Sequence, residues 1–273
     1  MQITGVQTLT PLTAPFGARR RFRTFRSVFA LILREMATTY GRSPGGYIWA
    51  VLEPVAAIAL LSFAFSLAFR APTLGISFPM FYATGYLPFM MFLDVSIKSA
   101  GAIRFSRPLL NFGALTWFDV VLARFLLNLF THLLTAVVVI TGLLLAFETR
   151  TSLYMPAIFN ALGTAAILAA GVGLTNAYLF LAFPAWERIW QVATRPLFIM
   201  SGVFFIFEDV PQDVRHFLWF NPLFHVTGEM RRGFYPTYAA DYVAPEFVVA
   251  LGLGLALFGM LLLSRHADGL VHK

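Results

Sequence analysis

The chain has 273 residues, of which 59% are hydrophobic and only 12% are charged, with a formal net charge of +7. Soluble domains carry about 25% charged residues, so this composition excludes an ordinary soluble protein. The absence of cysteine excludes disulfides and thiolate metal sites. Positive charge also suits nucleic acid, but excess arginine in a membrane protein sets orientation and meets anionic lipid, so we expect no nucleic-acid partner.

Residues 1–18 are predicted to form an N-terminal tail without a signal peptide, because the first long apolar run begins near residue 47, behind a basic segment. Residues 19–42 are predicted to form an amphipathic helix in the cytoplasmic membrane interface, since apolar side chains recur at three- and four-residue spacing with arginines between them. The apolar stripe consists of Phe22, Phe25, Phe29, Ile32, Leu33 and Met36. This helix either simply anchors the chain or offers the same surface to a partner protein.

Six long apolar stretches follow, and each predicts a membrane-spanning helix, because about 20 apolar residues cross the hydrocarbon core and lipid offers the backbone no other partner. The predicted spans are 47–69, 79–97, 119–147, 153–183, 189–207 and 247–264, in a single transmembrane domain over 47–264. Placing both termini in the cytoplasm, with a C-terminal tail at 265–273, puts most of the 20 Lys and Arg residues inside. The fold class is therefore all-α and polytopic.

Polar residues inside the spans have two interpretations each. Asp94 and Lys98 stand four residues apart at the inner end of the second span, either as a gate or as an ion pair that reaches the headgroups. Arg124, Asn128 and His132 draw one polar stripe along the third span. In one interpretation, the stripe lines a polar path. In the other, Arg124 reaches the lipid headgroups, and Asn128 and His132 form hydrogen bonds with a neighbouring helix.

Small residues recur at strict four-residue spacing in the fourth span, at Ala161, Ala165, Ala169 and Gly173. One stripe of small side chains lets helices approach closely. We interpret it as packing, with no catalytic content.

Three connections between the predicted spans contain residues that indicate a role beyond joining two helices. Two of them, 98–117 and 184–188, lie on the inner side and are predicted to contact a partner protein. The alternative interpretation of Trp186 in the second connection is an aromatic residue of the belt at the membrane interface. The outer connection, 208–246, is predicted to form a periplasmic gate region of short re-entrant helices, because 217–226 is strongly apolar. Its aromatic residues either suit sugar rings at an exit or form a lid over the outer helix ends.

The chain lacks the signatures of an enzyme. Its two lysine positions, Lys98 and Lys273, have no glycine loop before them, so the chain cannot bind ATP through a phosphate loop. Zinc-protease, hydrolase-elbow and kinase motifs are also missing, and the five histidines show no ligand spacing. We therefore expect no catalytic residue and no metal or other cofactor on this chain.

Short motifs in order along nearly the whole chain resemble the membrane subunit of ABC-2 type exporters, which move capsular polysaccharide across the bacterial inner membrane. They are Arg34-Glu35-Met36, Tyr40-Gly41, Gly46-Tyr47-Ile48-Trp49-Ala50, Leu52-Glu53-Pro54, Ile76-Ser77-Phe78-Pro79, Gly101-Ala102-Ile103, Leu110-Asn111-Phe112, Ala123-Arg124, Leu218-Trp219, Asn221-Pro222-Leu223 and His225-Val226. The first inner loop departs from the family pattern at Arg104-Phe105-Ser106-Arg107.

The resemblance implies a homodimer in the inner membrane, bound to two copies of a separate ATPase subunit that holds the ATP and Mg. It implies a lipid-linked acidic polysaccharide as substrate, surrounding membrane lipids, and periplasmic and outer-membrane polysaccharide export proteins as further partners. The interface helix and both inner loops correspond to the family's ATPase-coupling elements. The coupling residues are then Arg34, Glu35, Tyr40, Arg42, Gly101, Arg104, Arg107, Asn111, Trp186, Glu187 and Arg188.

The substrate path is predicted to include the polar stripe of the third span and an exit in the outer connection, where basic residues attract an acidic polymer. The path residues are Arg124, Asn128, His132, Trp219, Phe220, His225, Arg231 and Arg232. Three alternatives stay open: an exporter of O-antigen or teichoic acid, a polytopic polysaccharide-modifying enzyme, and an ion-coupled carrier. The enzyme would need catalytic residues at a fitting spacing. The ion-coupled carrier would need more buried charge and an internal repeat.

Overall fold

The computed structural model describes residues 23–39, 46–110 and 115–271, and over these residues the chain forms helices and no strand. The helices are α1 (Arg23–Thr39), α2 (Gly46–Ala68), α3 (Phe78–Ala100), α4 (Ala102–Phe105), α5 (Arg107–Leu110), α6 (Trp117–Ala146), α7 (Met155–Ala182), α8 (Pro184–Ile199), the 3-10 helix η1 (Phe207–Asp209), α9 (Gln212–Trp219), α10 (Pro222–Phe234) and α11 (Pro245–Val271). The prediction of an all-α polytopic membrane protein is confirmed.

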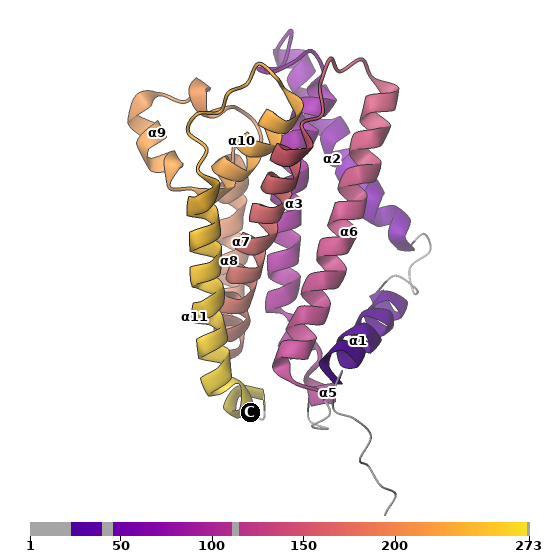
Figure 1. The fold of residues 1–273 in the computed structure, drawn as a ribbon, viewed down its shortest axis with the longest axis vertical. Coiled ribbons are helices and arrows are strands. Elements are labelled where there is room, and N and C mark those ends of the chain that lie inside the picture. The colour runs from indigo at the N-terminus through magenta and orange to yellow at the C-terminus, as the bar shows by residue number, and fades with distance from the viewer. Residues whose placement is uncertain (1–22, 40–45, 111–114, 272–273) are drawn as a thin grey trace, which may run out of the picture.

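Five helices of the described chain are long and apolar enough to cross a membrane, and they lie side by side as one bundle (Figure 1). These segments are Ile48–Ala68, Phe78–Ala100, Trp117–Ala146, Met155–Ala182 and Pro245–Ala267. Each coincides with a span predicted from hydropathy. One end of the bundle carries α1, α5 and the C-terminal end of α11, and the other carries α9 and α10 (Figure 1). We call these the α1 end and the α10 end.

The predicted span 189–207 is wrong as a single helix. α8 has 16 residues, starts five residues earlier than predicted and ends at Ile199, and the chain from there to Ile206 is turn and irregular backbone. Pro196 lies in the last turn of α8, and Gly202 has a φ of +76°. This left-handed conformation, three residues beyond the end of α8, is compatible with glycine and cannot continue a right-handed helix. Apolar composition predicted an apolar segment here but neither the residue at which its helix begins nor the residue at which the helix ends.

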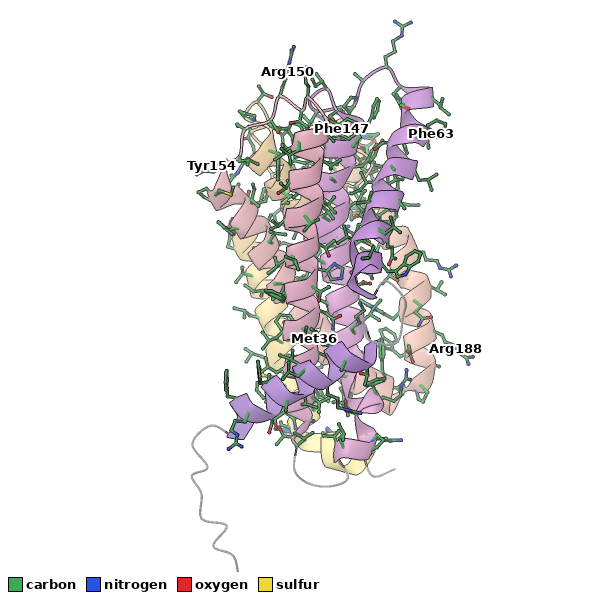
Figure 2. The ribbon with its side chains drawn as sticks, turned by 90° about the vertical axis from the view of Figure 1, so that its right-hand side faces the viewer. Met36, Phe63, Phe147, Arg150, Tyr154 and Arg188 are labelled. Atoms are coloured by element: carbon green, nitrogen blue, oxygen red, sulfur yellow. The ribbon has the colours of Figure 1, made fainter. Side chains whose placement is uncertain are left out.

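The amphipathic helix is present as α1, which lies across the bundle at the α1 end (Figure 2). Val28 and Leu31 are buried in a cluster with Val120 and Val121 of α6. Side chains such as Phe29 remain exposed. The helix therefore packs on the bundle through one row of apolar residues and leaves the predicted stripe largely free.

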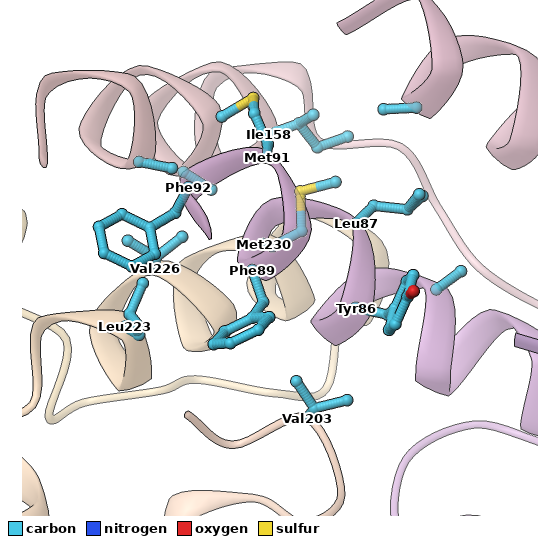
Figure 3. Close-up of a cluster of buried hydrophobic side chains, with 14 of the residues drawn as sticks. Tyr86, Leu87, Phe89, Met91, Phe92, Ile158, Val203, Leu223, Val226 and Met230 are labelled. Carbon is cyan, nitrogen blue, oxygen red and sulfur yellow. The ribbon is translucent and has the colours of Figure 1, made fainter. Parts of the chain in front are cut away.

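The main core lies where α3, α7 and α10 meet, and Figure 3 shows side chains from these helices with Val203 of the irregular segment. Ala161, Ala165 and Ala169 are fully buried in this core. A Cβ on Gly173 would lie 3.0 Å from Ser99 Cβ of α3. The small-residue stripe is therefore confirmed as a packing surface, and it lets α7 approach α3 closely.

Candidate functional site

Two ion pairs at the α1 end connect elements that are far apart in the sequence. Glu35 of α1 accepts a hydrogen bond from Arg124 Nε of α6 at 2.6 Å, and both side chains are largely buried, with 16% and 13% exposed. The Arg124 guanidinium also lies 4.1 Å from the ring centre of Phe105 in α4, a cation–π contact. One arginine thus joins the interface helix, the first inner loop and a long helix of the bundle.

A capping box sets the position of Arg124. Thr116 accepts from the Asp119 backbone N–H, and the Asp119 carboxylate accepts from the Thr116 backbone N–H. Reciprocal capping satisfies two otherwise free donors at the first turn and fixes where the helix begins. α6 therefore starts at Trp117, which places Arg124 two turns into the helix, beside α1.

The second ion pair joins the two inner connections to each other. Both nitrogens at the tip of Arg104 in α4 bond the carboxylate of Glu187 at the start of α8, at 2.6 and 2.8 Å. This pairing raises the pKa of Arg104. Half of the Arg104 side chain is exposed, so the pair contributes only about 0–1 kcal/mol to stability. It is a weak link compared with Glu35–Arg124.

The other predicted coupling residues lie around these pairs. Trp186 is half-buried and donates through Nε1 to Asn176 Oδ1 of α7 at 2.9 Å, which holds the start of α8 against the bundle. Arg34 is exposed on α1, and Arg188 points away from the bundle (Figure 2). Gly101 and Arg107 flank α4, and both are half-buried. The predicted residues Tyr40, Arg42 and Asn111 lie outside the described residues.

The predicted polar stripe of α6 serves more than one purpose. Arg124 bonds Glu35, and Asn128 donates to the Arg124 carbonyl within its own helix at 2.7 Å. His132 instead approaches Asp94 of α3, with Nε2 3.2 Å from the carboxylate, and Lys98 lies 3.5 Å from the same oxygen. His132, Asp94 and Lys98 line a cavity of about 220 Å³ between α2, α3 and α6. Of the stripe, only His132 faces this cavity.

The α10 end is organised by a buried arginine. Arg231 is 1% exposed, donates to the carbonyls of Phe205 at 2.9 Å and Val203 at 3.0 Å, and lies 4.2 Å from the ring centre of Phe81. Burial raises the pKa of Tyr235 nearby to about 12. The prediction that Arg231 meets substrate at an exit is at odds with this burial.

His225 is also a structural residue in this structure. It is fully buried. Its Nε2 donates to the Trp219 carbonyl at 2.7 Å and its Nδ1 accepts from the Ala244 N–H at 3.1 Å. Burial lowers the pKa of His225, and protonation of Nδ1 would remove the acceptor for Ala244. The neutral ring therefore ties the end of α9 to the start of α11.

The remaining predicted exit residues differ in their exposure. Trp219 stacks on Phe247 with ring centres 5.3 Å apart and donates to the Tyr242 carbonyl at 3.2 Å, so it mainly holds α9 on α11. Phe220 is 58% exposed. Arg232 has 42% of its side chain exposed and pairs with the buried Glu229 at 2.8 Å. Phe220 and Arg232 are the two that a substrate could contact directly.

Glu229 was missed in the sequence, and it anchors α10 to α7. Its Oε1 accepts from Asn160 Nδ2 of α7 at 3.0 Å as well as from Arg232. The Asn221-Pro222 pair, in which Asn221 caps the Leu223 N–H, was a usable signal for the start of α10. The i,i+3 spacing of Glu229 and Arg232 was a signal for their ion pair. No spacing indicated the bonds of Glu229 to Asn160 or of Arg231 to Val203 and Phe205, because these partners are distant along the chain.

Comparison with known proteins covers most of the chain. Residues 26–235 match the family described as ABC-2 type transporter. The chain is 32% identical over 242 residues to the polysialic acid transport protein KpsM of Escherichia coli, covering 85% of this chain and 92% of that protein. It is 28% identical over 246 residues to the capsule polysaccharide export inner-membrane protein CtrC of Neisseria meningitidis serogroup B, covering 89% and 92%. A match to BexB of Haemophilus influenzae, also a capsule polysaccharide export inner-membrane protein, is 27% identical over 252 residues, covering 90% and 92%. The chain therefore belongs to the ABC-2 type transporter family.

Proposed function

We propose that this chain is the membrane permease of an exporter that carries capsular polysaccharide across the bacterial inner membrane. Its relatives are named for polysialic acid transport and for capsule polysaccharide export. These names favour capsular polysaccharide over O-antigen or teichoic acid, which the sequence pattern alone left open. Membership of the ABC-2 type family also favours a transport subunit over a membrane enzyme or an ion-coupled carrier.

The observation that carries the proposal is that three contacts connect α1, α4 and α8 at one end of the bundle. They are the ion pairs Glu35–Arg124 and Arg104–Glu187 and the contact of Arg124 with the Phe105 ring of α4. A permease that is driven by a separate ATPase needs a contact surface that is attached to helices in the membrane. These three elements form such a surface, and Arg124 attaches it to α6. We assign this end to the cytoplasm, where two copies of the ATPase subunit, with their ATP and Mg, would bind a homodimer of this chain.

We further propose six membrane crossings per chain. α8 begins beside α4 and residues 200–206 continue it toward α10. A helix of 16 residues is about 24 Å long, short of the roughly 30 Å hydrocarbon core. Irregular backbone is tolerated at membrane depth where the protein satisfies it. Here Asn221 bonds the Met200 carbonyl, Thr227 that of Ser201, and Arg231 the carbonyls of Val203 and Phe205.

At the opposite, periplasmic end, α9 and α10 would form the gate region of residues 208–246. Phe220 and Arg232 lie where a lipid-linked acidic polysaccharide would leave, toward periplasmic and outer-membrane export proteins. Arg232 would attract the polymer by simple charge attraction. Trp219, His225 and Arg231 would act indirectly, because they hold the helices that present this surface.

Co-expression with the candidate ATPase subunit tests the proposal. We expect a stable complex whose ATPase activity changes when this chain is present, and restoration of surface capsule in a strain that lacks its own permease. Glu187→Arg should weaken ATPase stimulation, and Arg104→Glu combined with it should recover part of the loss. A chain that forms no complex and restores no capsule would refute the function.

A further inference from the structure

A seam between α2 and α6 holds two adjoining hollows, of which only one is lined by charged side chains. The first is the polar cavity of about 220 Å³ described above, where Glu53 of α2 faces the same space as Lys98 and His132. The second is an apolar groove of about 570 Å³ between the same two helices, lined mainly by aliphatic side chains. Hollows of 300–1,000 Å³ that are largely apolar are typical of small-molecule sites.

The two hollows follow one another along one face of α6. On α6 the polar part is lined by Thr131 and Thr135, and the apolar part begins at Val138 and continues through Gly142 and Ala146. Spacings of three and four residues place these positions on one helix face. Figure 2 shows α6, which ends just before Phe147, and α2, which carries Phe63, both above α1. The polar cavity thus lies nearer to α1 and the groove farther from it.

Some charged side chains in the polar cavity lack a close partner of opposite charge among the described residues. Asp94 interacts with both His132 and Lys98, and the 3.5 Å contact leaves 43% of the Lys98 side chain exposed. Glu53 is exposed in the described chain and forms no hydrogen bond or ion pair with another described residue. A carboxylate at membrane depth costs several kcal/mol without a partner. The cavity therefore presents one free carboxylate and one partly free ammonium group to its occupant.

We propose that this seam binds a phospholipid whose headgroup carries a primary amine, such as phosphatidylethanolamine. The phosphate would lie at Lys98, the amine would donate to Glu53, and one acyl chain would fill the groove between α2 and α6. The placement suits a lipid of the inner leaflet, because α1 lies at the level of its headgroups and the groove runs outward from there. This site goes beyond the export function and needs no ATPase subunit.

Native mass spectrometry of the full-length chain, released from nanodiscs, tests the head of the site. The nanodiscs would contain equal parts of phosphatidylethanolamine, phosphatidylcholine and phosphatidylglycerol. We expect retention of the primary amine lipid about tenfold above the other two, which corresponds to about 1.4 kcal/mol. Glu53→Gln should abolish this preference, whereas Glu148→Gln, at an exposed carboxylate outside the seam, should preserve it. Equal retention of the three lipids by the natural chain would overturn the proposal.

Two glycine variants test the groove. A Cβ on Gly142 or on Gly163 of α7 meets no atom within 4 Å, so both sites accept a larger side chain without a clash. Only Gly142 lines the groove. Gly142→Leu should therefore lower lipid retention about tenfold, and Gly163→Leu should leave it unchanged. Unchanged retention in Gly142→Leu refutes the acyl-chain assignment, and a change only in its oligomeric state would show that a second copy fills the seam.

Discussion

Buried polar side chains at the α10 end stabilise backbone that is not helical. Arg231 bonds two carbonyls of residues 200–206, and His225 bonds a carbonyl on one side and an N–H on the other. Each of these groups would otherwise be buried without a partner, at a cost of about 1–3 kcal/mol. Residues that resembled an exit lining in the sequence therefore determine the shape of the outer region instead.

Arg231→Met should destabilise the chain by about 3 kcal/mol or more, because it leaves two buried carbonyls without donors. Arg231→Lys should recover little, since a single ammonium group lacks the planar fork that reaches both oxygens. Thermal unfolding of the purified protein in detergent measures the loss. Arg232→Met is the control, because its side chain is partly exposed; it should unfold close to the natural chain. Equal melting of the Arg231 and Arg232 variants would contradict the structural role.

Stability should fall as the pH drops below about 6.5, the ordinary value for histidine. The pKa of His225 is lowered in the fold because of its burial. The unfolded chain therefore takes up a proton first, and the stabilisation that is full above the unfolded pKa is lost as the pH falls through the folded one. Melting curves between pH 5 and 8 measure this loss. His225→Gln should flatten the dependence, whereas His216→Gln, at an exposed ring, should not; identical profiles would exclude His225 as its source.

At the scale of whole helices, glycines set the distances in the bundle. Gly171 of α7 faces Gly252 of α11, and Gly259 of α11 faces Leu174 and Thr175 of α7, so closely that a Cβ would overlap the opposite backbone. Contact between backbones gains dispersion energy and removes gaps, which drives helix association in lipid, where hydrophobic burial contributes little. The α7–α11 pair therefore depends on the absence of side chains.

Gly171→Leu should separate α7 from α11 and destabilise the bundle by about 1–3 kcal/mol or more, the usual cost of overpacking. Gly163→Leu on the same helix meets open space and should be tolerated, with a small gain in helix propensity. The yield of monodisperse protein and its melting temperature distinguish the two variants. If both behave alike, close approach at Gly171 is not required for the fold.

Hydropathy predicted the long helices well. Each crossing needs about 20 apolar residues and satisfies its backbone hydrogen bonds within the helix, wherever that helix lies in the bundle. The break after Ile199 was not predictable from apolar content, since the carbonyls there are satisfied by Asn221, which caps α10, and by Thr227 and Arg231 within α10. The Glu35–Arg124 pair links residues 89 positions apart, a distance over which helical periodicity carries no information. Local patterns therefore identified the elements, and their partners emerged only from the fold.

For the whole molecule, the two ion pairs at the α1 end differ in a way that bears on transport. Glu35–Arg124 is largely buried, whereas Arg104–Glu187 is half exposed. Removing one partner of a buried ion pair lowers the free energy of unfolding by at most about 3–5 kcal/mol, whereas an exposed ion pair contributes only about 0–1 kcal/mol to it. The first pair would hold α1 on α6 throughout a transport cycle, and the second is weak enough to open and close as the inner connections move.

Charge reversal separates these roles. Glu35→Arg or Arg124→Glu alone should lower folded yield and surface capsule strongly, because each places two like charges in a largely buried position. The double reversal should restore yield and part of the export, although Phe105 then loses the cation that lies 4.1 Å from its ring. Reversal at Arg104 or Glu187 should leave the yield nearly unchanged and reduce only the ATPase response of the complex. A double Glu35–Arg124 variant as defective as the single ones would show that contacts other than this ion pair hold the interface helix in place.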